Sequence, residues 1–316
     1  MSQPPLSQFD AVVVGGGPAG LNGALILARS RRSVVVVDAG EPRNGPAEAA
    51  HGLFARDGIP PVDLLATGRE EVRRVGGRII DGEVVGVRRT DTGLEVSLAD
   101  ETTLVARRLL VTTGLVDMLP ELPGIAEGWG KDVIHCPYCH GYEVRDRKIA
   151  VLGISPASTH QALMFRQLSS DVVYFIHTWA LSAEDRERFD ALGIAVVEGE
   201  VTEILRSDGG VTGIRTADGV VAREVVAISS RMEVRGGFLD GIGLNPIEHP
   251  SGMGTFLPSD GMGRSEAEGV WLAGNVTDLT AQVGAAAAAG ALAGAQINAD
   301  LIAVETEDAV RRHRTA

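Results

Sequence analysis

The chain has 316 residues, of which 44% are hydrophobic and 22% charged, a composition typical of a globular protein long enough for two domains. Its formal net charge of −13 argues against nucleic acid as a partner. The segment from Met1 to Gln8 is polar and lacks the basic and apolar regions of a signal peptide, so we expect a cytoplasmic protein.

The first motif follows a short apolar run, Phe9 to Val14, that predicts a buried parallel strand. A G-x-G-x-x-G loop, a helical pattern, a second apolar strand and Asp38 come next. This order predicts a dinucleotide site, with the pyrophosphate at the helix N-terminus and the acid on the adenosine ribose. The motif alone does not separate FAD from NAD. The predicted cofactor-binding residues here are Gly15, Gly17, Pro18, Ala19, Gly20, Asp38 and Ala39.

A long loop follows from Glu41 to Pro61, and long loops in compact domains are often functional. It carries His51, for which we favour a surface position over one near the cofactor or substrate. Pro61 to Val75 then predicts an amphipathic helix, and two alternating runs between 84 and 98 predict a hairpin. A buried strand from Leu109 to Thr113 ends at Gly114, and a proline-bearing linker follows.

The only two cysteines of the chain, Cys136 and Cys139, form a C-x-x-C motif flanked by His135 and His140. Such a pair near a βαβ pattern indicates a redox-active disulfide. A zinc site is the first alternative, but zinc commonly uses two separated ligand pairs and no second pair exists here. An inert structural disulfide is the other alternative, and disulfides are rare in cytosolic proteins. We predict no metal.

A second βαβ pattern follows the cysteines, with strands at 148–152 and 172–176 and a helix opened by Ser155 and Pro156. Its glycine fingerprint is missing, because only Gly153 of the loop is a glycine. The end of the second strand, 177–181, offers neither an arginine for NADPH nor an acid for NADH. We therefore expect the architecture of a nucleotide domain with a degenerate nucleotide site. Further strands are predicted at 195–201, 211–215 and 220–228.

The C-terminal part begins with a short strand, 270–273, followed by Gly274 and Asn275. An alanine-rich helix is predicted from Gly284 to about Leu301. We interpret its uncharged stretch as a buried, tightly packed helix rather than a membrane span. Arg311 to Arg314 is predicted to be a frayed basic end.

The order of these motifs resembles the small FAD-dependent thioredoxin reductases over nearly the whole chain. The resemblance implies an α/β fold of two doubly wound, Rossmann-like domains in a homodimer. A split FAD-binding domain would cover 1–117 and 246–316, and an inserted NAD(P)-type domain carrying the C-x-x-C would cover 118–245. The residues that the resemblance adds to the FAD site are Gly114, Gly274, Asn275, Val276, Gln282 and Val283.

The chain departs from the reductases at three places. The NADPH fingerprint is absent, His140 stands where they have aspartate, and Asn275 replaces the aspartate of their G-D pair. The stretch C-P-Y-C-H-G-Y-E is instead similar to the dithiol oxidases of the gliotoxin, holomycin and romidepsin pathways. Those enzymes pass electrons from a small dithiol through the C-x-x-C to FAD and then to oxygen.

The resemblance implies that a substrate thiolate attacks Cys136, that Cys139 lies nearer the flavin, and that oxygen is reduced to hydrogen peroxide. His140 is the expected general base and thiolate stabiliser, with His135 as a further candidate. The main alternative is a flavin reductase of thioredoxin or a small disulfide, driven by NADPH or another donor. A second alternative is a resistance module that binds a dithiol without turnover.

Overall fold

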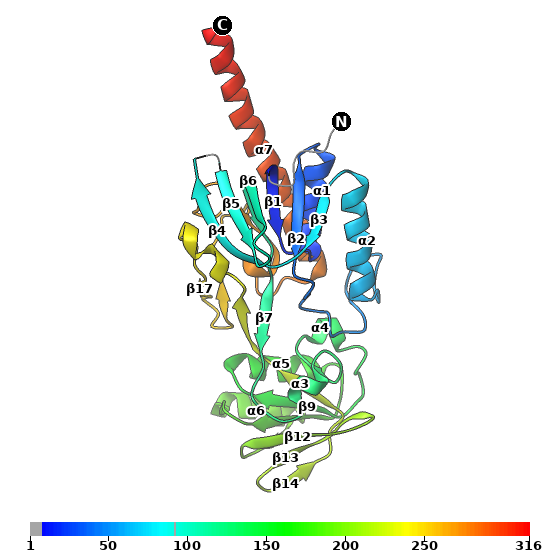
Figure 1. The fold of residues 1–316 in the computed structure, drawn as a ribbon. Helices are drawn as coiled ribbons and strands as arrows, with labels where there is room; N and C mark the ends of the chain where they lie inside the picture. The colour runs from blue at the N-terminus through cyan, green and yellow to red at the C-terminus, as the bar shows by residue number, and fades with distance from the viewer. Residues whose placement is uncertain (1–7, 92) are drawn as a thin grey trace. The chain divides into compact units, whose positions relative to one another are not determined.

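The computed structural model describes residues 8–91 and 93–316, which form two compact units (Figure 1). Unit 1 contains residues 8–43, Val62–Val116 and Met232–Ala316. Unit 2 contains Asn44–Pro61 and Asp117–Arg231. The segment 44–61 therefore has its contacts in unit 2, together with the C-x-x-C motif. The assignment of an FAD role to one unit and a nicotinamide-type role to the other stays a prediction.

Unit 1 is built on a seven-stranded sheet in the order β3-β2-β1-β6-β5-β4, with β19 paired to β6. The strands β3, β2, β1, β6 and β19 are parallel, and β5 is antiparallel to both β6 and β4. The predicted doubly wound α/β fold and the predicted hairpin are both confirmed. The elements are β1 (Gln8–Val14), α1 (Pro18–Arg29), β2 (Val34–Asp38), α2 (Pro61–Arg74), β3 (Arg78–Asp81), β4 (Val84–Thr90), β5 (Gly93–Leu98), β6 (Thr103–Val111), η1 (Gly237–Ile242), β17 (Ile247–Glu248), β18 (Thr255–Phe256), β19 (Val270–Leu272), η2 (Gly274–Val276) and α7 (Val283–Thr315).

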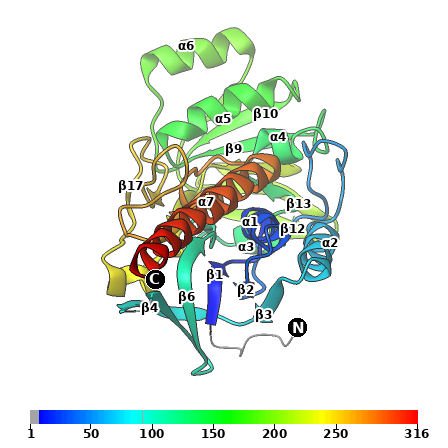
Figure 2. The ribbon, with the colours of Figure 1, turned by 90° about the horizontal axis from the view of Figure 1, so that it is seen from above.

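The central strand β1 is covered on both faces, as its unbroken apolar run predicts. Val12 and Val14 join the core that β4, β5 and η1 cover, whereas Ala11 and Val13 join the core under α1 and α7. Successive side chains of a strand point to opposite faces, so one run supplies both cores. Figure 2 shows α7 running beside α1 over this second face.

Glycines explain how closely α7 approaches α1. A Cβ at Gly290 would lie 1.9 Å from the carbonyl oxygen of Ala19, and one at Gly294 would lie 2.6 Å from that of Gly23. Side chains at these positions would push the helices apart. The alanine- and glycine-rich sequence is therefore the composition that tight packing requires, as predicted.

The helix α7 is longer than the sequence predicted, because it continues to Thr315 (Figure 1). The prediction of a frayed and solvated end at Arg311 to Arg314 is right about exposure but wrong about fraying, because these exposed residues continue the helix. Glu305 on this extension contacts Arg32 and Arg107 at 2.7 and 2.6 Å, which ties the helix to the sheet. The helix α7 is long and apolar enough to cross a membrane by length and composition alone, and 28% of its most apolar window is buried. Its buried residues pack in the core of unit 1, and the core helix of a globular protein can pass the same test. Its length and composition are therefore weak evidence for a membrane span.

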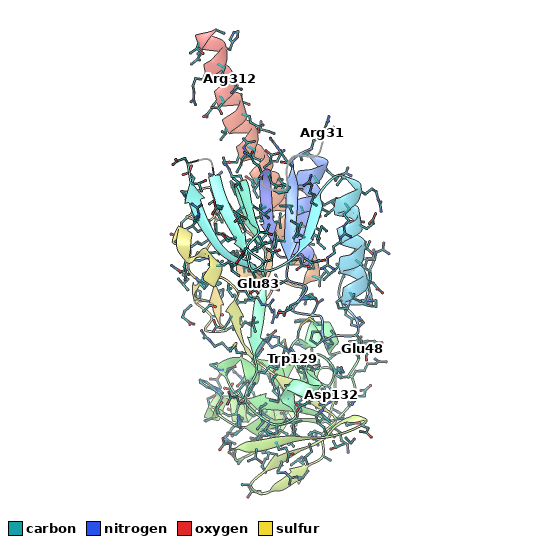
Figure 3. All side chains as sticks on the ribbon, in the orientation of Figure 1. Arg31, Glu48, Glu83, Trp129, Asp132 and Arg312 are labelled. Carbon is teal, nitrogen blue, oxygen red and sulfur yellow. A yellow bond between two sulfur atoms is a disulfide. The ribbon has the colours of Figure 1, made fainter. Side chains whose placement is uncertain are left out.

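Unit 2 contains a parallel five-stranded sheet in the order β11-β10-β9-β15-β8 and an antiparallel sheet of β12, β13 and β14. Asp132, labelled in Figure 3, joins the two, because its buried carboxylate contacts Arg206 at 2.7 Å and accepts from the backbone of Val211. The elements are α3 (Ile125–Gly128), β8 (Val133–Ile134), α4 (Pro137–His140), β9 (Ile149–Gly153), α5 (Pro156–Arg166), β10 (Val172–Ile176), α6 (Ala183–Leu192), β11 (Ala195–Val197), β12 (Val201–Ser207), β13 (Gly210–Thr216), β14 (Gly219–Val221) and β15 (Val225–Ile228).

The predicted second βαβ unit is confirmed as β9, α5 and β10, but two predicted strands were drawn incorrectly. The run 220–228 is two strands, because β14 pairs with β13 while β15 pairs with β9 in the other sheet. The run 195–201 likewise ends as a strand at Val197, and β12 begins at Val201. Apolar content alone could not show that the chain changes sheets at these points. Two further strands, β7 (Leu115–Met118) and β16 (Arg231–Val234), pair with each other.

Candidate functional site

The glycine loop after β1 has a structural reason for two of its glycines. Gly15 has a φ of +103°, and a Cβ there would lie 2.5 Å from the carbonyl oxygen of Thr112. A Cβ at Gly20 would lie 1.9 Å from the carbonyl oxygen of Gly15, so this glycine lets α1 pack on the strand. Gly17 is different, because no atom lies within 4 Å of a Cβ placed there. The space in front of Gly17 is therefore open, as a site for a pyrophosphate requires.

Asp38 ends β2 and faces the same loop. Its Oδ1 accepts a hydrogen bond of 3.1 Å from the backbone N–H of Gly16, and its Oδ2 pairs with Arg69 of α2. The Nε of Arg69 is buried without a hydrogen-bond partner among the described residues. A buried unpaired donor beside the acid predicted to bind the ribose fits a polar ligand at this point. Sequence reasoning missed Arg69, because its position on an amphipathic helix carried no signal of this role.

The other predicted cofactor residues of unit 1 follow neighbouring strands. Gly114 comes after β6 with a φ of +71° and open space around it, and Gly274 follows β19 with a φ of +79°. A Cβ at Gly274 would lie 2.9 Å from the side chain of Ala19 in the first turn of α1. Because β1, β6 and β19 are adjacent parallel strands, these turns meet at one sheet edge, where open α/β sheets bind ligands. The described residues therefore fit an FAD.

The remaining predicted residues of the C-terminal motif hold the turn before α7, fill the core or begin that helix. The Asn275 side chain donates to the carbonyl oxygens of Asp278 and Ala281 at 3.0 and 2.9 Å, so it holds the turn that precedes α7. Val276 is fully buried in the core, and Gln282 and Val283 begin α7. A contact of these residues with the cofactor stays a prediction.

Replacing Gly17 with alanine tests whether the glycine loop after β1 binds the pyrophosphate. We expect the variant to fold normally, because a Cβ at this position has open space, but to bind FAD more weakly by about tenfold or more, because the methyl group blocks the close approach of the pyrophosphate. The readout is the flavin absorbance per mole of protein after dialysis. The matched control is Gly237→Ala, where a Cβ also has open space. Equal flavin content in both variants would contradict the assignment.

In unit 2, Cys136 and Cys139 form a disulfide around the short helix α4, with their Cα atoms 5.3 Å apart. Cys136 caps the helix, and its carbonyl oxygen accepts from the backbone N–H groups of Cys139 and His140 at 3.2 Å each. Gly141 then packs under the turn, because a Cβ there would lie 2.3 Å from Leu168. Both cysteines are partly exposed, so a thiolate from solution can reach the disulfide.

His135 is anchored to the sheet. Its Nδ1 lies 3.0 Å from the carbonyl oxygen of Ile228, and Gln161 of α5 donates to the carbonyl oxygens of both His135 and Ile228. A carbonyl oxygen can only accept, so Nδ1 carries a proton in this contact. This arrangement fixes the orientation of the ring beside Cys136.

His140 follows Cys139 directly and is partly buried. Burial lowers the pKa of this imidazole below its usual 6.5, opposed by the nearby charge of Glu143 and supported by that of His51. Its Nε2 is buried without a hydrogen-bond partner among the described residues. The ring is therefore neutral at physiological pH, and a neutral imidazole beside a disulfide can accept a proton from an incoming thiol.

Two further residues lie beside His140, and neither was assigned a role from the sequence. The Nε2 of His51 lies 3.4 Å from Oε1 of Glu143, and both act electrostatically on His140. His51 is a loop residue, as predicted, and its side chain is 20% exposed, so it lies at the surface but is partly covered. Glu143 lies in the turn that follows α4, so helical spacing could not have paired it with His140 in advance.

The turn after β9 differs from a dinucleotide cradle. The backbone N–H groups of Ile154 and Ser155 donate to the buried hydroxyl of Ser158 at 3.2 and 3.3 Å. These hydrogen bonds belong to a capping box at the start of α5, and the side chain of Ser155 stands where unit 1 has the bare backbone of Gly17. A Cβ at Gly153 would lie 2.5 Å from the hydroxyl of Tyr174, so this glycine serves the packing of a tyrosine.

The polar groups at the end of β10 also form hydrogen bonds within the protein. The N–H groups of Thr178 and Trp179 donate to the carbonyl oxygen of Gly153, and His177 accepts from the backbone of Val201. The arginines of α6 pair with acids on that exposed helix or near it, as a solvated face would: Arg186 with Glu198, and Arg188 with Glu184 and Asp185.

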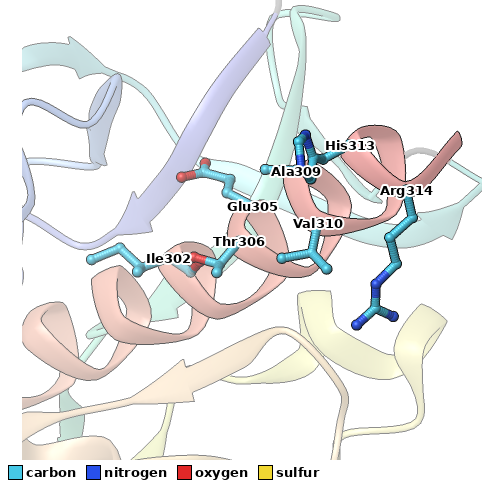
Figure 4. Close-up of a pocket in the computed structure, with 7 residues that line it drawn as sticks. All are labelled: Ile302, Glu305, Thr306, Ala309, Val310, His313 and Arg314. Atoms are coloured by element: carbon cyan, nitrogen blue, oxygen red, sulfur yellow. The ribbon is translucent and has the colours of Figure 1, made fainter. Parts of the chain in front are cut away.

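A hollow of about 500 Å³ lies elsewhere, along the exposed turns of α7 (Figure 4). It contains none of the predicted site residues. Its lining is Ile302, Glu305, Thr306, Ala309, Val310, His313 and Arg314. Within residues 8–91 and 93–316, no group of three or more histidine, cysteine or acidic side chains is placed to hold a metal ion.

Comparison with known proteins agrees with this geometry. Residues 9–291 match the sequence model of a family described as pyridine nucleotide-disulphide oxidoreductase. A relative from Claviceps purpurea (strain 20.1), described as thioredoxin reductase tcpT, is 31% identical over 93% of this chain and 94% of its own. The crystal structure of HlmI is 41% identical, with a TM-score of 0.91 over 98% of this chain and 97% of that one. An oxidoreductase from Agrobacterium tumefaciens is 30% identical, with a TM-score of 0.87 over 93% and 99%.

Proposed function

Because the chain belongs to the pyridine nucleotide-disulphide oxidoreductase family and is a thioredoxin reductase-like, FAD-binding oxidoreductase, we propose that it oxidises a small-molecule dithiol to an intramolecular disulfide, with oxygen as the electron acceptor. Cys136 and Cys139 carry the exchange, and His140 handles the proton. The products are the cyclic disulfide and hydrogen peroxide.

One observation supports an oxidase over a nicotinamide-driven reductase. In the loop after β9, Ser155 stands in register with Gly17 of unit 1, so a side chain occupies the position where a nicotinamide dinucleotide would need a bare backbone for its pyrophosphate. An enzyme that takes electrons from a dithiol and gives them to oxygen does not need that cofactor. The glycine loop of unit 1, in contrast, keeps the open space in front of Gly17.

The exchange begins when a substrate thiolate attacks Cys136. The bond between Cys136 and Cys139 breaks, Cys139 leaves as a thiolate, and a mixed disulfide forms between Cys136 and the substrate. The second substrate thiol then gives its proton to His140 and attacks the substrate sulfur, which releases the cyclic disulfide and the thiolate of Cys136. The dithiol has lost two electrons and two protons, and the protein holds both cysteines reduced.

Bound FAD supplies a two-electron acceptor for the reduced cysteine pair and passes those electrons to oxygen. Gly15, Gly17 and Gly20 would hold its pyrophosphate end, and Asp38 would hold the adenosine ribose. Gly114 and Gly274 would border it at the ends of their strands. The chain's own task during this stage is to bring Cys136 and Cys139 back into a disulfide, while His140 releases the proton that it accepted.

Steady-state turnover tests the proposal. With dithiothreitol in air-saturated buffer and no NADPH, we expect the holoprotein to consume oxygen and to form one peroxide for each dithiol oxidised. The measurements are an oxygen electrode trace and a peroxide assay on the same sample, with flavin alone as the control. Absence of oxygen uptake with every dithiol tried would contradict turnover and would favour a module that only binds dithiols.

A reductase of thioredoxin or a small disulfide is the second candidate, favoured by the printed description of the Claviceps purpurea relative. It requires NADPH or another electron donor. Oxidation of NADPH in the presence of a disulfide substrate, at a rate above that of dithiol-driven oxygen uptake, would select it.

A cytoplasmic homodimer completes the proposal. The helix α7 supports self-association, because it exposes apolar side chains along its length: Leu292, Ile302, Val304 and Val310. Light scattering on the holoprotein should return the mass of two chains. The mass of one chain at micromolar concentration would contradict the dimer.

A further inference from the structure

His51 lies between two carboxylates in unit 2. Its Nδ1 is 3.6 Å from Oδ1 of Asp57, and its Nε2 is 3.4 Å from Oε1 of Glu143. The imidazole is 20% exposed, whereas the carboxylates of Asp57 and Glu143 are 70% and 39% exposed. A histidine held away from solvent between two acids is placed to carry a charge that matters to its neighbours.

The loop that carries His51 is fixed by its own backbone. Ala50 donates to the carbonyl oxygen of Ile59 at 2.8 Å, and Gly58 donates to that of Ala50 at 3.0 Å. Asp57 accepts from the backbone of Gly52 at 2.8 Å, so this acid is held on the same side as His51. These hydrogen bonds therefore fix the backbone on both sides of His51.

The neighbour that connects His51 to the chemistry is Glu143. It is three residues beyond His140, and His140 directly follows Cys139 of the disulfide. His51 of the loop 44–61 therefore contacts the short segment, 135–143, that also carries the disulfide and His140. This contact could not be predicted from the sequence, because His51 is 85 residues away from Cys136 in the chain.

We propose that His51 and Glu143 act as an opposed pair on His140, so that the loop 44–61 sets the pH range in which His140 accepts the proton of a substrate thiol. His51 is then a positioning residue, because it acts only through His140. This inference rests on the proposed function for its biological meaning, but its first test below needs no substrate.

Two nearby charged groups act on the pKa of His140 in opposite directions. Burial lowers its pKa most; the negative charge of Glu143 raises that pKa, and the charge of His51 lowers it. The charge of His51 thus offsets that of Glu143 and helps to keep His140 in its proton-accepting form at lower pH. Of the charged residues of α5, which packs against α4, Arg166 points its guanidinium to the carbonyl oxygens of Leu192 and Ser169, and His160 is exposed; neither is among the groups that act on the pKa of His140.

The first test is an NMR titration of ring-labelled histidine in the oxidised holoprotein, with the His140 signal identified by its loss in His140→Asn. We expect Glu143→Gln to move the midpoint of the His140 titration to lower pH. His51→Asn should move it to higher pH, because the offsetting charge is gone. His160→Asn, a change on the exposed face of α5, is the matched control and should leave the midpoint in place.

The second test is the anaerobic rate of flavin bleaching by dithiothreitol between pH 5 and pH 8. His51→Asn should slow bleaching at the acid end by up to about tenfold, the change in the neutral fraction that one pH unit brings, and should match the unmodified protein at the alkaline end. A residue with only a structural role would lower the rate equally at all pH values.

Shifts of the two midpoints in the same direction, or no shift in either, would overturn the inference even if dithiol oxidation is confirmed. Conversely, opposite shifts in the resting protein would support it even if the physiological electron flow runs the other way. If His51→Asn fails to fold, Glu143→Gln still decides, because this partly exposed residue can change without opening the core, and an unmoved midpoint in that variant refutes the proposal.

Discussion

Replacing Cys139 with serine is expected to reduce dithiol-driven oxygen uptake to background, a loss on the order of 10³-fold or more, as for other residues that act as one catalytic unit. Serine cannot form the disulfide that the substrate thiolate attacks, so the dithiol has no sulfur electrophile. Cys136→Ser should be equally inactive for the same reason. The measurement is oxygen consumption with dithiothreitol at saturating FAD.

The Cys139→Ser variant should keep its fold and its flavin, because the cysteine is only partly buried in unit 2 and the predicted FAD residues are in unit 1. Flavin absorbance and circular dichroism check this point. Tyr138→Phe is the matched control, since Tyr138 lies between the cysteines and is 74% exposed, and it should retain the wild-type rate within about twofold, as surface changes usually do. Wild-type turnover by Cys139→Ser would refute the scheme.

Replacing His140 with asparagine is expected to slow dithiol oxidation near pH 7 by about 10²- to 10⁴-fold, the range that a general base contributes. Burial lowers the pKa of His140, so the unmodified enzyme holds the neutral, proton-accepting ring at pH 7. Its rate should fall as the pH drops through that lowered pKa and the ring becomes charged. The variant should lose this acid limb of the profile.

The alkaline side of the same experiment separates a base from a structural residue. Above the usual thiol pKa of about 8.5, the substrate is already a thiolate and needs no base. The gap between His140→Asn and the unmodified protein should therefore narrow as the pH rises, and His160→Asn should follow the unmodified protein throughout. A constant gap from pH 6 to pH 9 would show that His140 is structural. The profile is measured as the initial rate of oxygen uptake.

Much of unit 1 could be predicted from sequence because its signals are local. The glycine loop, the apolar strands and Asp38 occur within 30 residues, and the structure places each where the pattern requires. Arg69 could not be found this way, since its pairing with Asp38 depends on how α2 packs against the sheet. The length of α7 was underestimated because ion pairs of Glu305 with Arg32 and Arg107, distant in sequence, hold its second half.

In unit 2, too, the local motifs could be predicted from the sequence, whereas the contacts between distant residues could not. The missing glycine fingerprint was visible in the sequence, but the physical consequence was not, because only the structure shows the Ser158 hydroxyl accepting from the N–H groups of the turn. The disulfide and His140 were predicted from their motif. His51 and Glu143 were not assigned roles, because the loop 44–61 has its contacts with a unit that begins more than fifty residues later.

Anaerobic mixing of the holoprotein with dithiothreitol and, separately, with NADPH tests the central claim most directly. The flavin absorbance near its visible maximum is followed, and air is then admitted. The account predicts that dithiothreitol bleaches the flavin, that NADPH does not, and that air restores the colour with formation of peroxide. Rapid bleaching by NADPH would contradict the account, because it would mean that the turn closed by Ser158 still binds a nicotinamide cofactor and that the enzyme is a reductase.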